Sequence, residues 1–156
     1  MSLLSILHLR NDTISSFILL LWIIILTICS DIGGYVFGKF FKWKKISKIS
    51  PNKTLSGVFG SILFSVASIF IIGFIVESIS TMKADFFYKP RYFILAIIFS
   101  IIAQFGDFII SYFKRLEKIK DTGKILPGHG GIFDRIDGLM FVVLFAFIVY
   151  KFNLFP

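Results

Sequence analysis

A charged stretch lies between the last two apolar runs of the chain. Residues Ser111–Asp137 read SYFKRLEKIKDTGKILPGHGGIFDRID and hold six of the 17 basic and four of the 9 acidic residues. A loop that only connects membrane helices uses lysines and arginines for orientation, but it does not require aspartates beside a Pro-Gly-His-Gly-Gly turn. The pattern indicates a site that handles phosphate and a metal ion at a membrane surface.

Four apolar runs make up most of the remaining chain. They cover about residues 14–38, 56–76, 92–113 and 132–154, and each offers the roughly 20 residues that cross a bilayer core. Because backbone hydrogen bonds must be satisfied inside each span, the runs are predicted to be α-helices. No small-residue cleavage site follows the first run, so it is expected to be retained. The expected fold is all-α, a polytopic membrane domain over residues 1–156 with about four transmembrane helices and its site in 107–137.

The basic residues are concentrated in the connections between the apolar runs. The first connection has six lysines and no acid, the third has six basic residues, and the second has three, opposed by Asp85. The positive-inside rule places the first and third connections, and with them the site, in the cytoplasm. This distribution accounts for the net charge of +8 without nucleic-acid binding. The expected location is the plasma (inner) membrane of a bacterium.

Aspartates stand near the predicted cytoplasmic ends of three spans. Asp31 lies near the end of the first span and Asp107 near the end of the third, while Asp134 and Asp137 open the fourth at i, i+3 spacing. Acidic residues inside membrane spans are costly and indicate function. Clustered carboxylates repel one another unless a cation neutralises them, and Mg²⁺ binds one or two carboxylates plus substrate phosphates. The alternative for each aspartate is an ion pair with a nearby basic side chain.

Two further elements are candidates for binding phosphate. The glycine-rich segment 128–131 precedes the fourth span, where backbone amides and a helix N-terminus favour an anion, although a tight turn is the competing interpretation. Within it, His129 could contact phosphate, act as acid or base, or hold the turn. Lys53 and Thr54 follow a turn shaped by Pro51 at the mouth of the second span. No serine or cysteine nucleophile is paired with a base, which favours phosphoryl or nucleotidyl transfer to a lipid phosphate.

The chain resembles the CDP-diacylglycerol synthases, also called phosphatidate cytidylyltransferases. The positions that match the family signature are Ser111, Lys114-Arg115, Lys120-Asp121, Gly123, Pro127, His129-Gly130-Gly131, Asp134-Arg135 and Asp137. Two flanking family motifs are similar to Asp31–Lys39 and to Ser50–Thr54 with Gly57. The chain departs from the family in two respects. Ser56 and Ile110 stand where the family often has glutamate, and only thirty residues precede Asp31, where family members usually carry several further spans.

The resemblance implies a reaction of CTP with phosphatidate that gives CDP-diacylglycerol and pyrophosphate. It implies Mg²⁺, with or without a monovalent ion such as K⁺, held by Asp107 and Asp134 with support from Asp121 and Asp137. The candidate catalytic residues are Asp107, Lys120, Asp121, His129, Asp134 and Asp137. The candidate substrate-binding residues are Asp31, Lys53, Thr54, Ser111, Lys114, Arg115, Gly130, Gly131 and Arg135. The family suggests a homodimer, and a second chain could supply the missing N-terminal helices.

Three other functions compete with this one. A CTP-dependent lipid kinase of the polyprenol or phytol type would transfer the γ-phosphate to an alcohol and release CDP. An inactive paralogue or assembly partner would keep the fold without the chemistry. A transporter is disfavoured because it requires charged groups in mid-membrane, whereas these aspartates lie near one surface.

Overall fold

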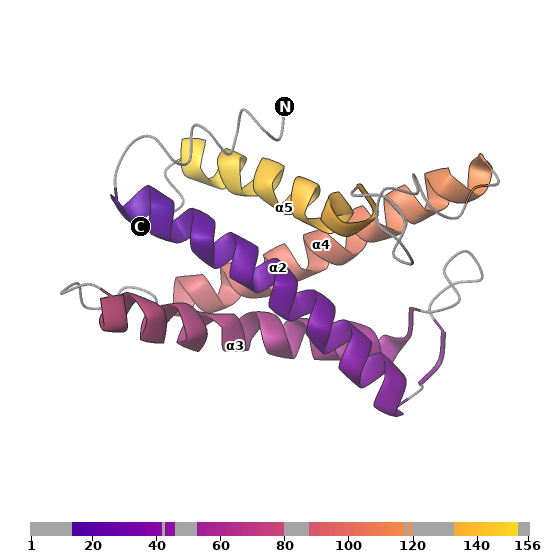
Figure 1. The fold of residues 1–156 in the computed structure, drawn as a ribbon, viewed down its shortest axis with the longest axis horizontal. Coiled ribbons are helices and arrows are strands. Elements are labelled where there is room, and N and C mark those ends of the chain that lie inside the picture. The colour runs from indigo at the N-terminus through magenta and orange to yellow at the C-terminus, as the bar shows by residue number, and fades with distance from the viewer. Residues whose placement is uncertain are drawn as a thin grey trace.

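The computed structural model describes residues 14–41, 43–45, 53–79, 88–117, 119 and 133–152. Side chains are described from Phe17 onward in the helix that begins at residue 14, as far as Ser78 in the helix that ends at residue 79, and from Asp137 onward in the helix that begins at residue 133. Within these ranges the chain forms four α-helices, shown in Figure 1. They are α2 (Ile14–Phe41), α3 (Leu55–Ile79), α4 (Pro90–Leu116) and α5 (Phe133–Lys151). Each begins and ends within three residues of a predicted span, and the predicted all-α fold is confirmed.

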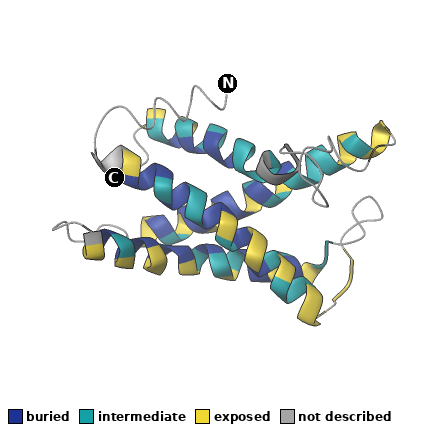
Figure 2. Ribbon diagram, viewed as in Figure 1, coloured by how far each residue is buried: buried dark blue, intermediate teal, exposed yellow. Residues whose placement is uncertain are grey.

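Three of the helices have the length and composition of membrane spans. Within the segments Phe17–Phe41, Leu55–Ser78 and Pro90–Leu116, an 18-residue window reaches a mean hydropathy of 2.3, 2.5 and 2.3, respectively. Exposed aromatic and aliphatic side chains occur along these helices, such as Phe74 (73% exposed) and Phe105 (61%). In Figure 2 the exposed positions recur in yellow along the ribbons. Such side chains suit contact with lipid tails. The fourth predicted crossing corresponds to α5, which has 19 residues, and its passage through the bilayer stays a prediction.

Helices α2 and α3 cross at a seam of small residues. A Cβ atom added at Gly33 would overlap the carbonyl of Gly60 and the Phe64 side chain, and one at Gly34 would lie 2.6 Å from the Ser61 hydroxyl oxygen. Small residues let membrane helices approach closely and pack backbone against backbone. The glycine pair Gly33-Gly34 thus lets α2 pack closely against α3.

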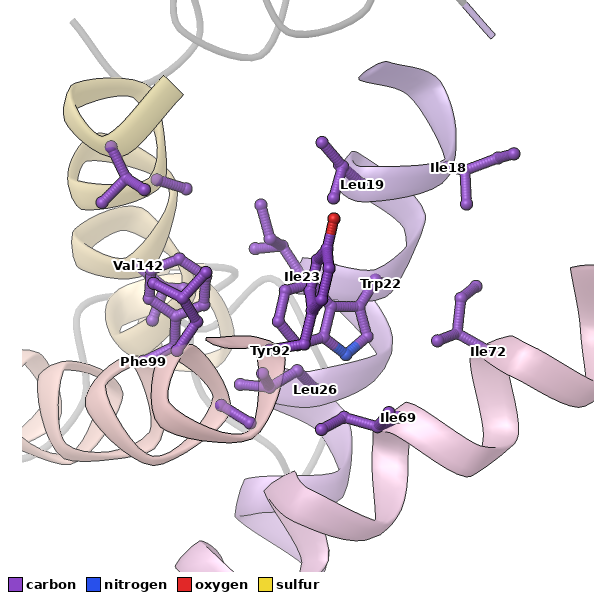
Figure 3. Packing of buried hydrophobic residues seen from close by; sticks show 14 of the residues in the cluster. Ile18, Leu19, Trp22, Ile23, Leu26, Ile69, Ile72, Tyr92, Phe99 and Val142 are labelled. Atoms are coloured by element: carbon purple, nitrogen blue, oxygen red, sulfur yellow. The ribbon is translucent and has the colours of Figure 1, made fainter. Parts of the chain in front are cut away.

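The apolar core lies where α2 meets the other three helices. Trp22 is fully buried, with its ring centroid 5.4 Å from that of Tyr92 and 6.0 Å from that of Phe99. Figure 3 shows these rings gathered with Ile69 and Ile72 of α3. The Trp22 Nε1–H group donates to the Ser68 hydroxyl at 3.2 Å, which satisfies the indole inside the core.

The bundle presents four helix ends on one side. The C-terminal ends of α2 and α4 and the N-terminal ends of α3 and α5 point the same way, to the right in Figure 1. The backbone amide of Leu55 donates to the Lys44 carbonyl at 3.1 Å, and Lys45 pairs with Thr54 across an isolated β-bridge. These contacts hold the start of α3 close to the end of α2, so polar residues near all four ends can meet.

Candidate active site

A cavity of about 420 Å³ lies between the four helices near these ends. Its lining combines charged side chains with the glycines and small residues of the α2–α3 seam. Seven of the residues predicted from sequence line it: Asp31, Lys53, Thr54, Asp107, Ser111, Lys114 and Asp137. The structure therefore brings together side chains that are up to 106 residues apart in the chain (137 minus 31).

Asp107, on α4, is paired with a lysine that precedes α3. The Lys53 ammonium lies 3.3 Å from Asp107 Oδ2 and donates to the backbone carbonyl of Gln104 at 3.1 Å. The two charged side chains keep 27% and 32% of their surface exposed, so water screens the pair. A pair of this kind contributes little to stability, and its position on the cavity wall is the more informative property.

Thr54 fixes the direction in which Lys53 enters the cavity. Its Oγ1 accepts a hydrogen bond at 3.2 Å from the backbone amide of Gly57, three residues later, as an N-cap residue does. Its hydroxyl also shares a hydrogen bond at 3.0 Å with that of Ser56, which is buried. Thr54 thus defines the first turn of α3, and Ser56 contributes to that cap.

Asp137, near the start of α5, lies beside Asp107. The site where a Gly138 Cβ would stand is 3.2 Å from Asp107 Oδ1, and the two carboxyl groups are close enough for a hydrogen bond. The Gly138 amide donates to Asp137 Oδ1 at 2.9 Å, and the Lys114 ammonium lies 3.9 Å from Asp137 Oδ2. Each of the two adjacent carboxylates therefore has its own lysine.

The donor set of this pair fits a hard divalent cation. Asp107 and Asp137 offer carboxylate oxygens from two helices, and Mg²⁺ commonly takes one or two carboxylates while phosphates and waters complete its octahedron. Over the residues that the structure describes, no three His, Cys, Asp or Glu side chains come together as a complete metal cage. Asp31 lines the same cavity from α2 without joining such a group.

The remaining predicted residues fall into two sets. Arg115 is exposed and does not line the cavity, so its role in substrate binding stays a prediction. Five others lie outside the described residues: Lys120, Asp121, His129, Gly130 and Gly131. The backbones of Asp134 and Arg135 lie in α5, but their side chains lie outside the described part of the chain.

Several lining residues were missed from sequence, among them Tyr35, Ser61 and Gln104. Gln104 lies one turn before Asp107, and its backbone carbonyl holds Lys53. Its amide nitrogen lies 3.5 Å from the Ser100 hydroxyl, which in turn shares a hydrogen bond at 3.1 Å with Ser30 of α2. A glutamine inside an apolar span, on the helical face of an aspartate, is the signal that could have identified it.

The fold and the cavity define an α-helical membrane protein with carboxylates and lysines gathered near one end of its helices. This chain belongs to the Cytidylyltransferase family, whose sequence pattern matches residues 1–153. The family resemblance drawn from the sequence motifs is thereby confirmed.

Several bacterial proteins named phosphatidate cytidylyltransferase are similar to the chain. The Helicobacter pylori protein is 36% identical over 126 residues, which are 80% of this chain and 44% of that protein. The Rickettsia conorii protein is 38% identical over 136 residues (82% and 57%), and the Staphylococcus epidermidis protein is 42% identical over 116 residues (73% and 42%). The chain spans about half the length of the curated relatives it matches.

Proposed function

We propose that this protein transfers a cytidylyl group from CTP to phosphatidate, forming CDP-diacylglycerol and pyrophosphate for phospholipid biosynthesis. The observation that carries the proposal is the meeting of Asp107 and Asp137 in a lysine-bearing cavity of a membrane-spanning bundle. Membership of the Cytidylyltransferase family and the names of the relatives support the same reaction.

The chemistry requires positioning and charge neutralisation more than a protein nucleophile. A phosphate oxygen of phosphatidate attacks the α-phosphorus of CTP, the bond to the β-phosphate bridging oxygen breaks, and pyrophosphate leaves. Lys53 and Lys114 lie on the cavity wall where they can neutralise phosphate oxygens. Asp107 and Asp137 would hold Mg²⁺, joined by the predicted ligands Asp134 and Asp121; the bound ion supplies Lewis-acid stabilisation of the phosphate charge.

A second cavity supports a lipid as the acceptor. It has a volume of about 220 Å³ and adjoins the first at Asp31, which lines both. Its other walls include Ile24 and Ile28 of α2 and Leu139 of α5, toward the middle of the spans. An acyl chain lying there would leave its phosphate beside the carboxylate and lysine cluster.

The decisive test is product analysis with purified protein. Wild-type protein with Mg²⁺, labelled CTP and phosphatidate should give labelled lipid and pyrophosphate, whereas a lipid kinase would release CDP. Asp107→Asn and Asp134→Asn should each lower the rate by about 100-fold or more, because a charge-stabilising ligand of the reacting phosphates is lost. An absence of lipid product from well-folded wild type, or equal product from both variants, would leave the inactive-paralogue interpretation standing.

The proposed orientation places the cavity at the cytoplasmic face of a bacterial inner membrane. The first connection, which carries Lys44 and Lys45, lies at this end of the bundle, and positive connections stay cytoplasmic. A Lys45→Cys variant in a Cys29→Ser background tests it, because Lys45 is exposed. A membrane-impermeant maleimide should label it in inverted vesicles and leave it unlabelled in intact spheroplasts; the opposite result reverses the topology.

The quaternary arrangement proposed for the active enzyme is a homodimer, or a complex with a chain that supplies further N-terminal helices. Resemblance to the family supports the first arrangement, and the length of the relatives is compatible with the second. Native mass spectrometry of the detergent-solubilised protein distinguishes two copies, one copy, and a copy joined to another chain.

A further inference from the structure

We propose that Lys53 couples the binding of the divalent cation to that of the nucleotide. In the structure its ammonium lies beside Asp107, where a divalent cation would bind, and it turns to the nucleotide phosphates when a metal–nucleotide complex enters. The inference rests on the proposed function, because that function supplies both ligands.

The position of the ammonium group is the first observation. Lys53 Nζ lies 3.3 Å from Asp107 Oδ2 and 3.1 Å from the Gln104 carbonyl oxygen, so it occupies the oxygen-lined side of the carboxylate pair. A divalent ion bound to Asp107 beside Asp137 would meet this positive charge at close range. The ammonium therefore competes with a metal that arrives without an anion.

The balance of charge in the cavity is the second observation. Three described carboxylates line it, from Asp31, Asp107 and Asp137, together with the two ammonium groups of Lys53 and Lys114. A free nucleotide would face the carboxylates, and a free divalent cation would face the lysines. The two together satisfy both sets of charges, so each should strengthen binding of the other by the same factor.

The anchoring of the lysine backbone is the third observation. Thr54 caps α3 through the Gly57 amide, and Leu55 is hydrogen-bonded to Lys44, so the chain on the C-terminal side of Lys53 is fixed. The lysine side chain is flexible and presents three rotatable donors. With 27% of its side chain exposed on the cavity wall, it can rotate from Asp107 to a phosphate without a shift of the backbone.

Direct cation binding tests this without measuring turnover. Mn²⁺ affinity is determined by electron paramagnetic resonance for wild type, Lys53→Met and Lys53→Gln, with and without the α,β-methylene analogue of CTP. In wild type the analogue should raise Mn²⁺ affinity at least tenfold. Both variants should bind Mn²⁺ alone several-fold more tightly than wild type, and the effect of the analogue should fall to about threefold or less.

Two controls separate charge at this position from charge in general. Lys45→Met removes the same charge from an exposed position of the same connection and should behave as wild type. Lys53→Arg should retain the coupling. Lys53→Gln keeps a polar side chain at this position, so the same Mn²⁺ comparison can be made with it if Lys53→Met fails to fold in detergent.

The outcomes distinguish this inference from the proposed function. If wild type makes CDP-diacylglycerol but Lys53→Gln binds Mn²⁺ alone no more tightly than wild type, the coupling role is wrong and the proposed function stands. If folded wild type neither binds the CTP analogue with Mn²⁺ nor forms lipid product, the proposed function itself fails, and the inference with it.

Discussion

Gly138 of α5 lies directly against Asp107 of α4. A Cβ atom added at Gly138 would stand 3.2 Å from Asp107 Oδ1 and 3.2 Å from the carbonyl oxygen of Ala103. Both distances are shorter than ordinary van der Waals contact, and one of the atoms is backbone. The missing side chain therefore lets α5 approach α4 closely enough for Asp137, the preceding residue, to reach Asp107.

Replacing this glycine should damage the site more than the fold. Gly138→Ala is expected to push α5 away by a few tenths of an ångström and to lower the rate of the proposed cytidylyl transfer about tenfold. Gly138→Val should lower it about 100-fold, because small misplacements of reacting groups are costly. The measurement is the initial rate of lipid product at saturating CTP, alongside thermal unfolding in detergent.

A matched control for this substitution is Gly73→Ala. Gly73 is buried on the spanning helix α3, and an added Cβ would meet the hydroxyl end of Tyr88, remote from the cavity. This variant should keep the wild-type rate. Equal losses from the alanine variants at positions 138 and 73 would mean that the effect is general destabilisation.

The architecture was predictable because its causes are local. Each apolar run had the length of a bilayer crossing, and aspartates near the ends of the first, third and fourth runs must lie on one side of an up-and-down bundle. The pairing of Lys53 with Asp107 was not predictable, because it joins residues 54 apart and depends on how α3 packs on α4.

Arg115 belongs to the sequence signature, but its exposed side chain does not line the cavity. Asp107, Ser111 and Lys114 share one face of α4 and line the cavity. Arg115 follows immediately, but one residue turns an α-helix by about 100°, which directs its side chain away from that face. A signature position thus need not line the cavity that its neighbours form.

The cap at the start of α3 yields a second prediction. Thr54→Val keeps the shape of the side chain but removes the oxygen that accepts from Gly57, so it should cost about 1 kcal/mol of unfolding free energy. It should also weaken CTP binding, because Lys53 would lose its fixed starting point. Thr54→Ser should restore both properties, and a Thr54→Val variant with wild-type stability and CTP affinity would contradict the assignment of the cap.

The buried hydroxyl pair between α2 and α4 gives a third prediction. Ser30 and Ser100 are almost fully buried and share a hydrogen bond at 3.1 Å. Hydrogen bonds between membrane helices average about 0.6 kcal/mol. A double-mutant cycle with Ser30→Ala and Ser100→Ala, measured by unfolding in mixed micelles, should return a coupling energy of that size. Strictly additive effects would show that the contact is energetically neutral.

Two substitutions of Trp22, at the centre of the bundle, measure the contributions of packing and of hydrogen bonding to stability separately. Trp22→Ala should cost about 3–5 kcal/mol of unfolding free energy, because the fully buried ring contacts Tyr92 and Phe99 and leaves a cavity when removed. Trp22→Phe keeps much of that packing and loses the bond from Nε1 to Ser68, for an expected cost of about 1 kcal/mol attributable to the bond.

Ser68→Ala, made in wild type and in the Trp22→Phe protein, tests how much stability the hydrogen bond between Trp22 and Ser68 contributes. In wild type this substitution removes the acceptor of the indole N–H and should destabilise the protein, whereas in the Trp22→Phe background that bond is already absent and the cost should shrink. Both measurements use unfolding in mixed micelles, with CTP binding as a check that the cavity is intact. An undiminished Ser68→Ala cost in the Trp22→Phe protein would assign the stabilisation to the other bond of Ser68, which its hydroxyl donates to the Ser65 carbonyl at 2.6 Å.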